Sequence, residues 1–204
     1  GDSDYVSLAD SPDFDFGTGD FTIECWFYYD QATSPQYATI FDRGDGSGGG
    51  FSPFWLAVLD DSGLKLVCTC GTNGGQTNVI NNYNLATIVD NTWSHIAFTR
   101  HGNDFYVYLN GVSLSGAAQT NSDALSDHAY PVLFGARGQW PTAGYGVGSF
   151  WGGYIDECRI TKSLCRYPSG TTFTPSTTGL PGESRFQQTV VTSVSGSGNT
   201  TTYS

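Results

Sequence analysis

The sequence predicts an all-β fold in which two antiparallel sheets form a sandwich, followed by an extended C-terminal arm. Three observations support this prediction. Charged residues make up only 13% of the 204 residues, whereas aromatic residues make up 15%, and glycines number 27, a composition typical of β-rich proteins. Apolar and polar residues alternate in several short segments, as they do in half-buried strands. Turn-forming residues separate most of these segments, and no helical periodicity competes with them.

The strands follow from this alternation and from the turns between them. In residues 21–28 the odd-numbered side chains are all apolar and are expected to face the core, while the even-numbered ones are expected to face outward. Hairpin turns are expected at residues 60–63, 101–104 and 110–111. If the first core strand lies beside the last one, the sandwich is closed. In chain order, the predicted strands are residues 5–8, 21–28, 38–42, 54–59, 64–69, 79–80, 93–100, 105–109, 112–114, 132–136 and 153–162.

The strand at residues 153–162 carries an unexpected charge. Strict alternation places Asp156 on the inward face together with Tyr154 and Cys158. A carboxylate that points toward an apolar layer needs hydrogen bonds, a cation, or a bend that turns it outward. Cys25, on the neighbouring strand, is also expected to face inward. A disulfide between Cys25 and Cys158 could form there, although two buried thiols are favoured.

The remaining cysteines argue against a disulfide scaffold and against a zinc site. The chain has five cysteines, an odd number without dense spacing. Cys68 and Cys70 lie two positions apart on one predicted strand, so they share a face and are poorly placed to bridge each other. No C-x-x-C pair is present, which disfavours zinc.

The charge of the chain narrows the choice of partners. With 19 acidic and 8 basic residues, the formal net charge is -11. This sign disfavours nucleic acid, anionic membranes and sulfated glycans, because each of them would be repelled. It suits neutral sugars or cations. No apolar run reaches membrane-spanning length, so insertion into a membrane is not expected.

Three segments, taken in order, resemble a known family. They are FDFGTGDFTIECWF at residues 14–27, WSHIAFTR leading to YLNG at residues 93–111, and FGA followed by GYIDECRIT at residues 134–161. Over residues 5–175 their order and spacing are similar to laminin G-like domains of the concanavalin A-like lectin/glucanase superfamily. The form they resemble is found in phage tail, virion and bacterial surface proteins.

This resemblance implies a jelly roll over residues 1–175, often with a calcium ion at one rim, and a binding role rather than catalysis. It also implies a location on a virion, outside the cell or on the cell surface. Residues 176–204 fall outside the domain. They are rich in Ser, Thr and Gly and are expected to form a linker or an arm that becomes ordered against a partner.

A structural calcium ion is the cofactor that the sequence suggests. Asp13, Asp15 and Asp20 precede the first core strand, and Asp156 belongs to the strand expected to neighbour it. Calcium prefers six to eight oxygen ligands, which carboxylates on such loops could supply. In the alternative interpretation, Asp15 and Asp20 form turns and Asp156 caps backbone amides.

Aromatic loops are the expected ligand-binding site. Sugar rings dock on exposed aromatic faces while nearby polar groups hold their hydroxyls. One glycine-rich loop offers Trp140, Tyr145 and Trp151, and an opposing loop offers Trp55 and Asp45. In the alternative interpretation, Trp55 and Trp151 are core or subunit-contact residues.

These features predict a non-catalytic binding module that recognises glycans or a host-surface receptor. Glycosidases of this fold need paired carboxylates on one strand face, and here Asp156 and Glu157 fall on opposite faces while Glu24 stands alone. The alternative is a structural subunit, such as a capsid decoration, tail or fibre protein, that contacts copies of itself or other virion proteins. In that case the alternation around Val190–Val191 and Val194 would add a strand to another sheet.

Overall fold

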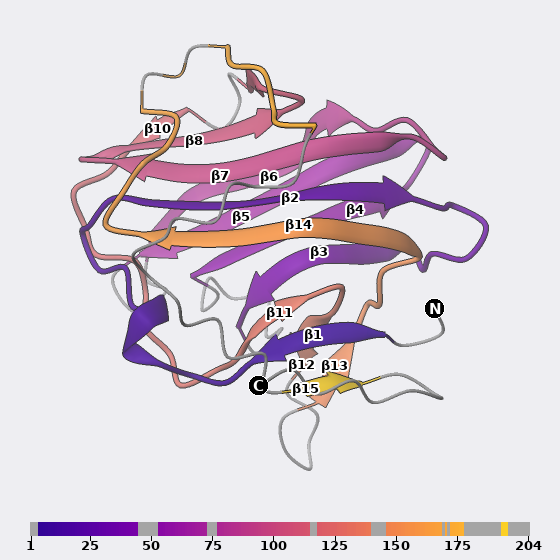
Figure 1. Cartoon of the computed structure of the whole chain (residues 1–204), viewed down its shortest axis with the longest axis horizontal. Coiled ribbons are helices and arrows are strands. Elements are labelled where there is room, and N and C mark those ends of the chain that lie inside the picture. The colour runs from indigo at the N-terminus through magenta and orange to yellow at the C-terminus, as the bar shows by residue number, and fades with distance from the viewer. Residues whose placement is uncertain are drawn as a thin grey trace.

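Two antiparallel sheets pack face to face in the computed structural model, and the longer strands run across the molecule one behind the other (Figure 1). The structure describes residues 4–44, 53–72, 77–114, 118–139, 146–168, 170, 172–177 and 193–195. This arrangement confirms the predicted two-sheet jelly-roll sandwich. Within the described residues, no helix is long and apolar enough to span a membrane.

The strand order defines the two layers. The seven-stranded sheet contains, in spatial order, β15 (Ser193–Ser195), β1 (Tyr5–Leu8), β11 (Val132–Phe134), β3 (Tyr37–Arg43), β4 (Phe54–Asp60), β5 (Leu64–Thr72) and β6 (Thr77–Thr87). The six-stranded sheet contains β10 (Gln119–Thr120), β8 (Asp104–Leu109), β7 (Trp93–His101), β2 (Phe21–Tyr29) and β14 (Gly153–Lys162), with β9 (Val112–Ser113) also paired to β8. The strands β12 (Arg137–Gln139) and β13 (Gly146–Gly148) form a separate pair, and η1 (Pro12–Phe14) is one short 3-10 turn.

The hydrophobic core lies between the sheets and is rich in aromatic rings. As the alternation predicts, the odd-numbered residues of β2 are fully buried in it. The rings of Phe16 and Phe21 stack with 4.6 Å between centroids, and Phe98 meets Phe21 edge to face at 5.1 Å. Because each buried ring removes a large apolar area from water, this cluster supplies most of the driving force for closing the sandwich.

The outer face of the six-stranded sheet is covered over only part of its area. We call the described residues 163–168, 170 and 172–177 the strap, because they run back from the end of β14 across this face. Thr22 donates a hydrogen bond to the carbonyl of Leu164, and the indole of Trp26 donates to the carbonyl of Ser176. The strap explains why the outward-facing Thr22 and Glu24 are nevertheless fully buried.

The strand β14 lies beside β2, as predicted, but the facing of its residues differs from the prediction. Asp156 pairs with Trp26 and Arg159 with Glu24, so a β-bulge interrupts the ladder between them. The extra residue shifts the alternation, and Glu157 takes up a φ of 52°. Ile160 packs on the core as expected, but Asp156 and Cys158 are exposed. The prediction that Asp156 faces inward was therefore wrong, and Cys158, which stays on the same face as Ile160, is exposed rather than buried.

The described part of the C-terminal segment adds a strand to this chain's own sheet. Val194 in β15 pairs with Val6 in β1, at the edge of the seven-stranded sheet. Under the alternative, structural function this segment was expected to add a strand to another sheet, whereas here it adds to the sheet of its own chain. Val190–Val191 lies outside the described residues.

Candidate functional site

Three aromatic side chains lie side by side on the uncovered part of the six-stranded sheet. Tyr28 in β2 pairs with Trp93 in β7 on one side and with Tyr154 in β14 on the other. The Tyr28 ring lies 5.7 Å from each of the other two, and the Trp93 and Tyr154 rings are 6.4 Å apart with 29° between their planes. We call Tyr28, Trp93 and Tyr154 the aromatic platform.

The local backbone brings the third ring of the platform into place. Gly153 begins β14 at a φ of 107°, and a Cβ atom there would clash with the carbonyl of Tyr28. A glycine at this position therefore lets β14 start in close contact with β2. As a result, Tyr154 stands directly beside Tyr28.

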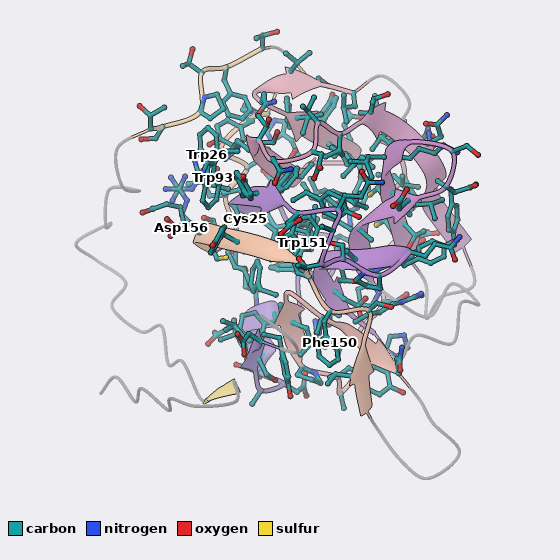
Figure 2. The ribbon with its side chains drawn as sticks, turned by 90° about the vertical axis from the view of Figure 1, so that its right-hand side faces the viewer. Cys25, Trp26, Trp93, Phe150, Trp151 and Asp156 are labelled. Carbon is teal, nitrogen blue, oxygen red and sulfur yellow. The ribbon has the colours of Figure 1, made fainter. Side chains whose placement is uncertain are left out.

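The platform is open to solvent. Trp93 is 44% exposed and Tyr154 is 67% exposed, both high values for large aromatic residues. Figure 2 shows Trp93 and Trp26 together on the outside of the six-stranded sheet, whereas Trp151 lies on its inner side. Exposed rings that gather in one place commonly mark a binding surface.

Polar groups border the platform on two sides. The hydroxyl of Tyr28 donates a hydrogen bond to Oδ1 of Asn91 at 3.2 Å, and Nδ2 of Asn91 donates to Oδ2 of Asp90 at 2.9 Å. On the other side stands Asp156, exposed next to Trp26. This border supplies amide and carboxylate oxygens, which accept hydrogen bonds from hydroxyl groups.

Beyond Trp26, the same face becomes a buried polar network under the strap. Glu24 is fully buried and accepts hydrogen bonds from Arg159 Nε at 2.7 Å and from the Tyr167 hydroxyl at 2.7 Å. Nε2 of His95 lies 3.2 Å from Oε2 of Glu24, the same oxygen that accepts from Tyr167. Burial alone would raise the pKa of Glu24, but these hydrogen bonds outweigh it and hold the pKa below its usual range.

Stacked rings seal this network from above. Tyr167 and Phe173 of the strap stack with 3.6 Å between centroids and 2° between planes. Phe173 also meets the ring of His95 edge to face at 5.8 Å and that of Tyr108 at 5.3 Å. The strap therefore divides the outer face into a closed half around Glu24 and an open half that carries the platform.

The structure buries two of the residues predicted to bind a ligand. Trp55 is 1% exposed, its indole donates to the Thr39 hydroxyl at 3.0 Å, and the Arg137 guanidinium lies 3.8 Å from its ring centre. Trp151 is 5% exposed and packs edge to face on Phe27 within the core. The expectation that these two rings are exposed was wrong, and the alternative core interpretation fits them. Asp45, Trp140 and Tyr145 lie outside the described residues.

Three of the four aspartates predicted to bind calcium are engaged separately, and the fourth is exposed. Asp15 pairs with Arg43 at 2.8 Å. Asp20 accepts from the backbone N–H of Gly102 at 2.7 Å and lies 3.0 Å from Nδ1 of His101. Asp156 accepts from the backbone N–H of its neighbour Glu157, as the capping interpretation expects. Asp13 is exposed in η1. Among the described residues, no three metal-ligating side chains are grouped so as to hold a metal ion.

An arginine occupies the acidic cluster around Asp15, one of the four aspartates of the calcium prediction. The side chain of Arg43 is 1% exposed, and its Nη2 atom lies 3.0 Å from Asp10, 2.8 Å from Asp15 and 3.1 Å from Asp127. Its guanidinium also donates to the carbonyls of Phe14 and His128. Arg43 thus supplies one positive charge to these three carboxylates.

The sequence analysis did not select the aromatic platform. The outward alternation of β2 already placed Tyr28 on the correct face, and Trp93 opens a strong predicted strand. Tyr154 was assigned inward because a bulge cannot be read from alternation alone. The signal that could have found the platform is three outward aromatic residues on three strands expected to be adjacent.

Comparison with known proteins agrees with this architecture. The family model of the concanavalin A-like lectin/glucanases superfamily, laminin G type, matches residues 1–165. The chain belongs to this superfamily. No curated protein sequence matches the chain.

Several solved structures share the superfamily fold. Domain 4 of AbnA, an extracellular arabinanase from Geobacillus stearothermophilus solved with arabinotriose, aligns with a TM-score of 0.51 and 18% identity over 76% of this chain and 64% of that one. The CBM40 of the Ruminococcus gnavus IT-sialidase aligns with a TM-score of 0.50 and 12% identity over 78% of this chain and 91% of that one. A putative carbohydrate-binding protein from Bacteroides ovatus aligns with a TM-score of 0.49 and 19% identity over 78% of this chain and 41% of that one. The chain thus spans less than two thirds of the first and third of these. At the low identities of the first two, the likeness establishes the fold alone.

Proposed function

We propose that this concanavalin A-like domain is a non-catalytic module that binds glycans, and that the aromatic platform is its binding surface. The observation that carries the proposal is the alignment of Tyr28, Trp93 and Tyr154 on three adjacent strands, open to solvent. The C–H faces of sugar rings pack against such rings. The polar border then orients the hydroxyl groups.

The charge around the platform favours neutral sugars. Asp90 and Asp156 border it, and the nearby Arg159 is already paired with Glu24. The whole chain also carries a net charge of -11. Anionic sugars would therefore meet repulsion without a compensating cation.

The proposal that the module is non-catalytic rests on the state of Glu24. This carboxylate is buried under the strap, and its oxygens are occupied by Arg159, Tyr167 and His95. Its lowered pKa keeps it ionised, so it is not suited to act as a general acid near neutral pH.

The test compares two aromatic residues with the same exposed fraction. Trp93 on the platform and Tyr83 on the opposite sheet are both 44% exposed. The wild type is screened against an array of neutral and anionic oligosaccharides, and the best binder is then titrated by calorimetry. We expect Trp93→Ala and Tyr154→Ala to weaken binding at least about tenfold, while Tyr83→Ala leaves it unchanged. Binding that survives both platform substitutions, or a preference for anionic glycans, would contradict the proposal.

A second candidate function is assembly, which the pairing of β15 with β1 favours. In an assembly, the same segment of one chain would add to the β1 edge of a neighbour, as expected of a virion or cell-surface subunit. Light scattering coupled to size-exclusion chromatography of the full chain and of a variant that ends at residue 177 tests this. An oligomer that depends on residues 178–204 supports it, and identical monomers count against it.

A further inference from the structure

The bulge in β14 places two cysteines opposite each other. In the ladder between β2 and β14, Trp26 pairs with Asp156 and Glu24 with Arg159. Cys25 lies between the two β2 residues and therefore faces the two bulge residues, Glu157 and Cys158. Bulge residues and the single residue they oppose are immediate neighbours across the strands. The Cys158 side chain also contributes to raising the pKa of the Cys25 thiol, as expected of two neighbouring thiols.

The spacing of paired strands suits a covalent link at this point. Residues opposite each other in antiparallel strands have Cα atoms about 4.5–5.5 Å apart. A disulfide usually spans about 4.4–6.8 Å between Cα atoms, so it can close here without a large backbone movement. Both cysteines are free thiols in this structure.

The two thiols differ in their access to solvent. Cys158 is exposed on an edge strand, whereas Cys25 is fully buried in the core beneath it. The other three cysteines, Cys68, Cys70 and Cys165, are all buried. An oxidant in solution can therefore reach this chain's sulfur atoms most readily at Cys158, and Cys25 is placed to react next.

We propose that Cys25 and Cys158 are a redox pair that closes into a disulfide between β2 and β14 when the protein meets a small-molecule disulfide. The thiolate of Cys158 attacks the reagent, which forms a mixed disulfide and releases one thiol. Cys25 then loses its proton and attacks the Cys158 sulfur, which breaks the mixed disulfide and releases the second thiol. The two cysteines are oxidised by two electrons, and the reagent is reduced to two thiols.

Burial sets the rate of the second step. Desolvation in the core raises the pKa of the Cys25 thiol well above its ordinary value. Attack by Cys25 therefore needs alkaline solution or a transient opening of the edge strand. The completed bond would fasten to β2 the strand that carries Tyr154 of the aromatic platform.

The test treats the full chain at about pH 8.5 with oxidised glutathione and follows its intact mass. We expect a short-lived glutathione adduct, followed by a product that has lost two hydrogen atoms and in which peptide mapping joins Cys25 to Cys158. In Cys25→Ser the adduct at Cys158 should persist, and in Cys165→Ser closure should proceed as in the wild type. The closed form should melt about 5–10 °C higher than the same sample after reduction.

Three outcomes would overturn the inference. They are a stable adduct at Cys158 in the wild-type chain, a disulfide that joins two molecules, and unchanged mass after treatment. Circular dichroism of each variant before treatment verifies that it is folded. Loss of glycan binding by the platform variants would not affect this result, because the two proposals rest on different residues.

Discussion

Arg43 and Asp15 form an ion pair with 2.8 Å between Nη2 and Oδ1, and Arg43 contributes a side chain that is only 1% exposed. The guanidinium joins the loop around Asp10 and Asp15 to the loop at residues 127–130. It is thus the cation around which one rim of the sandwich is organised.

Removing this cation should destabilise the fold. We expect Arg43→Met to lower the free energy of unfolding by about 3 kcal/mol, because a buried apolar chain leaves the carbonyls and carboxylates of both loops without their donor. Arg43→Lys keeps the charge but cannot reach as many acceptors. It should therefore lose only part of the free energy of unfolding that Arg43→Met loses. Urea unfolding of the three proteins measures this, and equal stability of wild type and Arg43→Met would refute the role.

Asp15 and Asp127 should make the stability of the fold depend on pH in opposite ways. The hydrogen bond from Arg43 lowers the pKa of Asp15, so Asp15 stabilises the fold above its unfolded pKa of about 3.9, and this contribution is lost as the pH falls through its lower folded pKa. The hydrogen bond with Asp15 raises the pKa of Asp127. The folded state therefore holds this proton more tightly, and stability declines as the pH rises through that range.

At pH 7 we therefore expect Asp127→Asn to raise Tm and Asp15→Asn to lower it. In acid strong enough to protonate Asp15 in the folded state, below its lowered pKa, both variants should approach the wild type, because all of these groups are then protonated in both states. Thermal melts at the two pH values provide the measurement. A shift of Tm in the same direction for both variants would contradict the assignment.

Chelation tests the predicted calcium ion. Because Arg43 already supplies a cation to Asp15 and its acidic neighbours, we expect EDTA to leave Tm of the wild type unchanged and added calcium not to raise it. A calcium-dependent rise in Tm that disappears in Asp15→Asn would instead support the site expected from Asp13, Asp15, Asp20 and Asp156.

The network around Glu24 should hold the strap in place. Glu24→Gln should cost about 2–4 kcal/mol, because it leaves the partly buried Arg159 beside a neutral group. Tyr167→Phe removes one hydrogen bond to a charged group and should cost about 1.5–3 kcal/mol. Since the folded pKa of Glu24 lies below its unfolded value of about 4.3, the cost of Glu24→Gln should be full above that pH and shrink in stronger acid. Unfolding curves at pH 7 and pH 3 provide the check.

Two tryptophans should separate stability from binding. Trp151→Ala should cost about 3–5 kcal/mol, because it opens a cavity beside Phe27 and Tyr29. Trp93→Ala should cost less than about 1 kcal/mol, since its ring is 44% exposed. Thermal and urea unfolding of the two variants measures this, and a larger loss for Trp93→Ala would reverse the assignment of core and platform.

The sequence predicted the layers of the fold better than it predicted the site. Strand alternation is a local property, so the inward residues of β2 and the pairing of β2 with β14 could be predicted. Burial of Trp55 depends on Arg137, which lies 82 positions away and covers its ring. Likewise, the strap decides which outward residues of β2 remain exposed, and such long-range contacts leave no periodic signal in the sequence.

The bulge in β14 also fixes the number of residues in the middle of this strand. Ile155 and Ile160 both pack against the core although they are five positions apart, an odd separation that strict alternation would assign to opposite faces. Deleting one residue between them would turn one isoleucine toward water or carry Arg159 away from Glu24. This stretch of the chain should therefore tolerate many changes of side chain but no change in the number of its residues.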